Sequence, residues 1–143
     1  MTENQIKHLE FIQNILTRMN SNSFQIKGWM ITIVSALLAL AADNKNDLFV
    51  LVAIAPTLIF WFVDTYYLQQ EKRFRSLYDG VRLRDDYDNS ENGTPNFSMD
   101  TTNYKEGPNK YWNCFRSKTI WPLYFLIFLS LLIIDYLFRK YGN

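Results

Sequence analysis

Three long apolar runs dominate this sequence, and each is long enough to cross a lipid bilayer. Residues 24–42 form the first run, which spans about 28 Å as an α-helix. Residues 48–68 and 119–138 form the second and third runs, and each contains only one charged side chain. Runs this long and this poor in charge are not typical of a buried helical hairpin in a soluble protein. The sequence therefore predicts an all-α integral membrane protein with three transmembrane helices.

The composition agrees with apolar spans that alternate with polar segments. Hydrophobic residues make up 48% of the 143 positions, yet the mean hydropathy is only -0.16, so the apolar residues must be concentrated in a few stretches. A chain of this length has room for a single membrane domain, residues 1–143. The formal net charge of +1 gives no basic excess of the kind that binds nucleic acid.

The segment before the first span, residues 2–20, has the pattern of an amphipathic helix. Thr2 and Gln5 have the spacing of a capping box, and residues 20–23 (Asn-Ser-Asn-Ser) are expected to end the helix. Apolar side chains recur at spacings of three and four residues and form one stripe, namely Leu9, Ile12, Leu16 and Met19. The stripe is expected to lie on the membrane surface, to pack on the chain's own helices, or to bind another subunit or a partner.

The segments between the spans differ in length and composition. Residues 43–47 are so few that the first two spans must form an antiparallel hairpin. Residues 69–84 keep apolar side chains at helical spacing, so they are expected to extend the second span beyond the membrane. Residues 85–118 are rich in Asp, Asn, Ser, Thr, Gly and Pro and end in an aromatic and basic stretch. We expect them to form a flexible loop.

Basic residues are divided unequally between the two sides of the predicted membrane domain. The side that holds the amino terminus and the 69–118 segment carries twelve Lys and Arg residues, whereas the hairpin tip and the carboxyl tail carry three. Basic segments near spans stay preferentially in the cytoplasm. The amino terminus is therefore expected in the cytoplasm and the carboxyl terminus on the outside.

One face of the first span carries only small residues. They recur at spacings of four, three, four and three, and we call this set the small-residue seam: Gly28, Thr32, Ser35, Ala39 and Ala42. Small seams let helix backbones approach closely, and such packing is a main source of helix association in lipid. The seam is expected to make a tight contact within the hairpin or between protomers. Alternatively, Thr32 and Ser35 face a water-filled path in an oligomer.

An acidic residue, Asp64, lies inside the second span, where an ionised side chain is costly unless it is paired or faces water. Counting outward from Lys45 at the hairpin tip, Lys27 lies eighteen residues back and Asp64 nineteen residues forward. The two side chains should therefore lie at nearly the same depth. The sequence predicts an ion pair between Lys27 and Asp64 near the cytoplasmic interface, which serves as a structural clamp or takes part in gating or an ion path.

The sequence offers few residues for catalysis or metal binding. His8 is the only histidine and is expected on the surface, and Cys114 is the only cysteine and is expected to be a small apolar residue. A glycine-rich phosphate loop is missing from the sequence. We therefore expect no enzymatic activity, no cofactor, no metal site and no nucleic-acid partner.

The first 84 residues have a distinctive layout. An amphipathic helix leads through Lys27-Gly28-Trp29 into a short-tipped two-span hairpin, which is followed by a charged helix at Glu71-Lys72-Arg73-Phe74-Arg75. This layout resembles the SLATT-type membrane effector proteins of bacterial conflict systems, although the third span and the acidic loop depart from the two-span form. The resemblance implies an inner-membrane effector in antiphage defence. A cytosolic sensor or a nucleotide signal would trigger it to disrupt the membrane.

These observations favour a homo-oligomeric inner-membrane effector that forms or gates a pore or disrupts the membrane. Oligomerisation is required because three helices from one chain cannot enclose a sizeable aqueous path. The small cytosolic part is not expected to build a nucleotide-binding domain, so sensing would come from a partner protein, such as a sensor or a nucleotide-signal-generating protein, or from a pocket shared between subunits. The alternatives are a non-conducting scaffold that anchors a cytosolic partner and a small proton-coupled transporter that uses Asp64.

Overall fold

Every regular element in the part of the chain that the structure describes is a helix. The computed structural model describes residues 1–44, 46–84 and 97–141. In chain order the elements are α1 (Glu3–Asn44), α2 (Leu48–Arg82), the 3-10 helices η1 (Thr102–Tyr104) and η2 (Gly107–Asn109), α3 (Tyr111–Phe115) and α4 (Trp121–Tyr141). The predicted all-α class is confirmed. Three of these helices, α1, α2 and α4, are long and apolar enough to cross a membrane.

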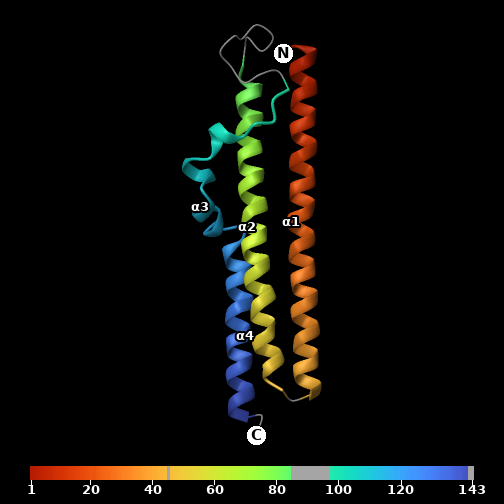
Figure 1. The fold of residues 1–143 in the computed structure, drawn as a ribbon, viewed down its shortest axis with the longest axis vertical. Coiled ribbons are helices and arrows are strands. Elements are labelled where there is room, and N and C mark those ends of the chain that lie inside the picture. Colours follow the sequence, from red (N-terminus) through yellow and green to blue (C-terminus); the bar gives the residue numbers. More distant parts are fainter. Residues whose placement is uncertain (45, 85–96, 142–143) are drawn as a thin grey trace.

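The helices form an elongated rod with an apolar half and a polar half. α1 and α2 run side by side as an antiparallel hairpin, and α4 packs along the part of α2 nearest the hairpin turn (Figure 1). The carboxyl end of α4 therefore lies at the same end as the turn, and the amino terminus lies at the opposite end. We call residues 24–44, 48–68 and 121–141 the apolar half, and residues 3–23 and 69–82 the polar half.

The first helix differs from the sequence prediction because α1 continues without a break through residues 20–23. Asn and Ser are weak helix formers, but each costs at most about 0.7 kcal/mol relative to Ala. Burying one Leu or Ile side chain contributes about 1.5–3 kcal/mol, and Ile12 and Ile26 are buried on either side of the expected break. Packing along α2 therefore outweighs the local preference, and residues 2–20 are not a separate helix.

The apolar stripe of the polar half packs on the chain's own second helix. Leu9 and Ile12 of α1 form a buried cluster with Leu77 and Val81 of α2, and Leu16 lies at its edge. Met19, the last member of the stripe, is half-buried. Of the environments expected for this stripe, the structure shows contact with the chain's own helix. Leu9 and Ile12 are therefore not exposed to a partner.

The segment 97–118 also differs from the prediction, because it is folded against α2 rather than forming a flexible loop. Asn109 is buried there. Its side-chain Nδ2 donates to the Ser76 hydroxyl at 3.1 Å and to the Tyr104 carbonyl at 2.9 Å. Its backbone carbonyl accepts from Gln69 Nε2 at 3.0 Å. A Cβ atom at Gly80 would lie 2.5 Å from the Tyr104 hydroxyl, so the glycine permits this close approach. Residues 85–96 of the expected loop lie outside the described residues.

Two polar side chains near the start of α1 fasten the polar half. Gln5 Nε2 donates to the carbonyls of Val81 and Arg84 at 2.7 and 3.0 Å, which satisfies acceptors at the end of α2. The backbone N–H of Gln5 donates to the Thr2 hydroxyl at 3.3 Å. This is the first half of the expected capping box. The Gln5 side chain donates to carbonyls at the end of α2 rather than back to Thr2.

His8 was expected on the surface, and the structure corrects this. Its side chain is fully buried, and Nε2 lies 2.9 Å from the carbonyl of Ser98, to which it donates in the matching tautomer. The His8 ring also lies 5.6 Å from the ring of Phe97. Burial lowers the pKa of His8; the Ser98 carbonyl opposes this shift and the charge of Arg84 adds to it. The polar sequence neighbours of His8 indicated a surface position. That prediction is wrong because the folded 97–118 segment covers the side chain.

Candidate functional site

A buried charge cluster joins all three long helices at the boundary between the apolar and polar halves. Asp64 of α2 is fully buried. Lys27 of α1 places Nζ 2.6 Å from Asp64 Oδ2, and the Ser23 hydroxyl donates to Asp64 Oδ1 at 2.5 Å. Tyr124 of α4 donates its hydroxyl to Asp64 Oδ2 at 3.2 Å. We call these four residues the Asp64 cluster.

The local sequence explains how one helix supplies two of these groups. Ser23 and Lys27 are four residues apart, so they lie on the same face of α1. Lys27 Nζ also donates to the Ser23 hydroxyl at 2.7 Å, and this fixes both side chains beside the carboxylate. The Lys27 side chain remains 21% exposed, so the ammonium lies at the rim of the cluster and the carboxylate lies inside it.

The cluster has the chemistry of an electrostatic clamp. Its two ionised groups have opposite charge, so no uncompensated charge is buried, and both carboxylate oxygens accept hydrogen bonds. Ser23 lies between the two charges, because its hydroxyl donates to Asp64 and accepts from Lys27. The arrangement therefore holds α1, α2 and α4 together at one carboxylate.

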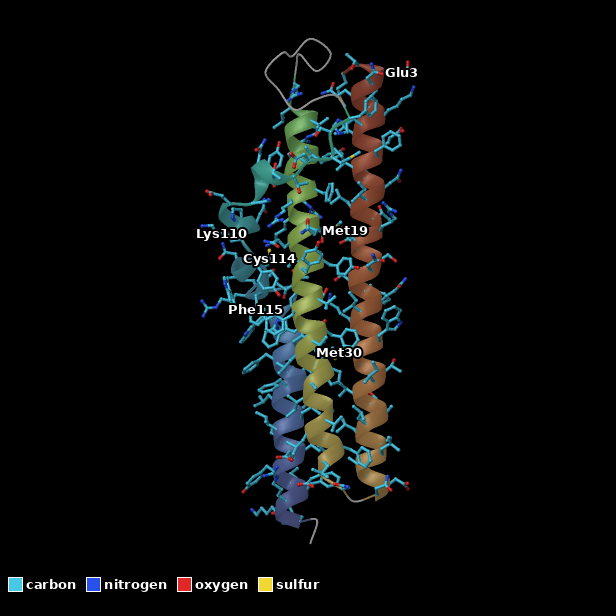
Figure 2. The ribbon with its side chains drawn as sticks, viewed as in Figure 1. Glu3, Met19, Met30, Lys110, Cys114 and Phe115 are labelled. Atoms are coloured by element: carbon cyan, nitrogen blue, oxygen red, sulfur yellow. The ribbon has the colours of Figure 1, made fainter. Side chains whose placement is uncertain are left out.

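An aromatic stack borders the cluster on the side of α4. The ring of Trp61 stacks on Phe115 of α3 at 4.4 Å and lies nearly parallel to the ring of Tyr124 at 5.9 Å. Figure 2 shows Phe115 and Cys114 beside α2, on the side away from α1. Trp61 is buried, and its Nε1 has no hydrogen-bond partner among the described residues. The stack ties the short helix α3 to the same level of the rod as Asp64.

The small-residue seam lies on the opposite side of α1 from α2. All five of its residues are exposed, whereas the α1 residues that pack into the hairpin are Ile26, Met30, Val34 and Ala41. Figure 2 places Met30 between the two helices. A Cβ atom added at Gly28 would meet nothing within 4 Å. Of the two contacts expected for the seam, the one within the hairpin is not made.

The hydroxyl groups of the seam bear on the expected water-filled path. Thr32 donates its hydroxyl to the carbonyl of Gly28 at 2.9 Å, one turn earlier in the same helix. Its hydrogen is therefore satisfied without water, as is common for Thr in membrane helices. Ser35 is exposed one turn further along. Thr32 is thus compatible with a close contact between helices as well as with a water-filled path.

Part of the Asp64 cluster is predictable from the sequence. Lys27 and Asp64 lie at nearly equal distances from the hairpin tip, and the structure pairs them. Ser23 belongs to the segment expected to end the first helix, although it is four residues from Lys27 and so shares its helix face. Tyr124 carried no such indication, because its role depends on how α4 packs against α2. Among the described residues, no group of three His, Cys, Asp or Glu side chains is arranged to hold a metal ion.

Comparison with known proteins adds no assignment. The chain has no significant match to a family model, to a characterised protein or to a solved structure.

Proposed function

We propose that this protein is a homo-oligomeric membrane effector that forms or gates a pore, or disrupts the membrane, with α1 at the contacts between subunits. The observation that carries the proposal is the exposed small-residue seam. Close backbone approach between helices is favourable in lipid, and the seam provides it on a face that the hairpin does not use. A second copy of the chain is the natural occupant of that face.

The Asp64 cluster supports a switch within each subunit. It joins α1, α2 and α4 through one carboxylate, so a change in the position of α1 would strain contacts to all three helices. A pair of charges at this depth is stable only while the partners stay together. The cluster therefore acts as the clamp that holds the resting arrangement, and its opening accompanies gating.

The biological setting of the proposal rests on the sequence. The excess of basic residues beside the polar half supports a cytoplasmic amino terminus and an external carboxyl terminus. The bacterial inner membrane is what the resemblance to SLATT-type effectors implies. The resemblance of residues 1–84 to SLATT-type effectors supports a role in antiphage defence. The trigger would act on the polar half and would come from a cytosolic partner or signal.

Substitution of Ser35 tests the subunit contact. We expect Ser35→Leu to weaken association about tenfold, roughly 1.4 kcal/mol, because the larger side chain holds the backbones apart. The native mass of the purified protein in detergent or lipid nanodiscs measures this. Ala36→Leu is the matched control, because it adds a similar bulk at an exposed position one residue along, outside the seam. Equal masses for wild type and Ser35→Leu would contradict the role of the seam.

A leakage assay separates the effector from the alternative of a scaffold. Vesicles that contain the oligomer and a trapped dye should release the dye when the trigger is present, and Ser35→Leu should release less. A scaffold would bind a cytosolic partner through the polar half and release no dye. Partner binding without dye release would therefore contradict the pore hypothesis and support the scaffold.

A further inference from the structure

A groove runs along one edge of the α1 and α2 hairpin, on the boundary between the polar and apolar halves. It consists of two adjoining hollows of about 300 and 290 Å³ that share Asn22 and Tyr67. The hollow toward the apolar half includes Trp29, Phe60 and Val63, and the hollow toward the polar half includes Arg18. We call the two together the Arg18 groove.

The lining of the groove changes from apolar to cationic along its length. Trp29 and Phe60 lie within the segments that are long and apolar enough to cross a membrane. Arg18 lies six residues before residue 24, where the apolar run begins, which is about 9 Å along the helix axis. That distance takes its Cα just past the polar headgroup layer, and a long Arg side chain readily reaches back toward the phosphates. Trp29 and Tyr67 are of the types that gather at membrane interfaces.

The charge at the polar end of the groove is not neutralised by any residue that the structure describes. Arg18 is exposed and makes no ion pair in the ranges 1–44, 46–84 and 97–141. The residues that line the two hollows include no Asp and no Glu. Two other arginines of the polar half differ in this respect, since Arg75 pairs with Glu71 and Arg82 pairs with Asp79. The groove thus presents one unpaired guanidinium above an apolar channel.

We propose that the Arg18 groove binds one anionic phospholipid. Its phosphate lies on the Arg18 guanidinium, with Asn22 and Tyr67 as further polar contacts, and one acyl chain lies against Trp29, Phe60 and Val63. A guanidinium binds phosphate oxygens by charge-assisted hydrogen bonds. The proposal needs the apolar half to lie in a bilayer, but it does not need pore formation or a particular subunit number.

Native mass spectrometry in detergent tests the proposal with phosphatidylglycerol and phosphatidylcholine of identical acyl chains. The wild type should bind one phosphatidylglycerol with about tenfold preference over phosphatidylcholine. Arg18→Gln should abolish this preference, because it lowers the affinity for the anionic phosphatidylglycerol more than the affinity for the zwitterionic phosphatidylcholine. Arg82→Gln removes the same charge from an exposed position outside the groove and should leave both affinities unchanged. Val63→Trp fills the channel and should weaken both lipids.

Several outcomes would overturn the lipid site. One is an unchanged lipid preference in Arg18→Gln, and another is an equal loss in Arg82→Gln, which would reduce the effect to net charge. Displacement of phosphatidylglycerol by inorganic phosphate at the same concentration would show that the acyl chain contributes nothing. Circular dichroism checks that Val63→Trp keeps the helix content of the wild type. If Val63→Trp does not fold, Arg18→Gln still tests the site, because Arg18 is exposed and its substitution leaves the packing intact. A change in subunit number in Arg18→Gln would also count against a pure lipid site.

Discussion

At the scale of single residues, the cost of an ionised side chain among apolar helices is offset by a complete set of partners. Asp64 receives one ammonium and two hydroxyl groups, from Lys27, Ser23 and Tyr124. Such a pair contributes little net stability over an apolar pair of the same shape, but the loss of one partner alone leaves an uncompensated charge. The cluster is therefore more sensitive to single substitutions than to paired ones.

Asp64→Asn tests this sensitivity. The amide keeps one acceptor oxygen, which can serve either Ser23 or Tyr124, and Lys27 loses its counter-charge. We therefore expect the protein to lose about 3 kcal/mol of stability. The double variant Lys27→Met with Asp64→Asn removes both charges and should recover a large part of that loss. Thermal unfolding in detergent, followed by circular dichroism, measures both. A double variant no more stable than Asp64→Asn would mean that the pair does not act as a clamp.

The position of a single residue could be predicted from the sequence only where its distance along a helix fixes that position. The partnership of Lys27 and Asp64 followed from counting outward from a five-residue hairpin tip, because the rise per residue of a helix is fixed. The burial of His8 could not be found in that way. It depends on Ser98, ninety positions along the chain, and on a segment whose composition suggested a flexible loop.

At the scale of elements, the long helices were predictable and the shorter segments were not. The three apolar runs are strong patterns, and residues 69–82 continue α2 as their spacing indicated. Local composition failed at residues 20–23 and 97–118, where weak helix formers and loop residues are held by contacts to α2. In both places tertiary packing outweighs intrinsic propensity. Asn109 is an example: a residue typical of loops becomes a buried junction.

The 97–118 segment should detach from α1 more readily in acid. Because the docked His8 has a pKa below its usual 6.5, the undocked state binds the proton more tightly. The stabilising contact is therefore complete above about pH 6.5 and weakens as the pH falls toward the docked pKa. Hydrogen exchange of residues 97–104 at pH 7.5 and 5.5, corrected for intrinsic rates, should show protection reduced severalfold in acid.

His8→Gln is the control for this effect. A glutamine amide can donate to the Ser98 carbonyl but does not titrate. Protection in this variant should be the same at the two pH values. If the wild type showed no loss of protection in acid, or if His8→Gln lost as much, the acid sensitivity would have to come from a group other than His8.

At the scale of the whole molecule, three features occupy different faces of one rod. The Asp64 cluster faces α4, the small-residue seam faces away from α2, and the Arg18 groove lies along one edge of the hairpin. A subunit can therefore hold its own helices together, contact another copy and bind a lipid without competition between the three. The polar half extends beyond all of them and is the part that a partner can reach.

The orientation of the rod decides whether these features can work as proposed, and site-specific labelling measures it. In a Cys114→Ala background, a cysteine at Glu10 should react with a membrane-impermeant maleimide only after lysis, and one at Asn46 should react in intact cells. The reason is that the basic excess favours a cytoplasmic polar half. Labelling of Glu10→Cys from outside would show that the rod has the opposite orientation in the membrane. A cytosolic trigger could then not reach the polar half, and the Arg18 groove would no longer face the cytoplasmic leaflet, where anionic lipids are enriched.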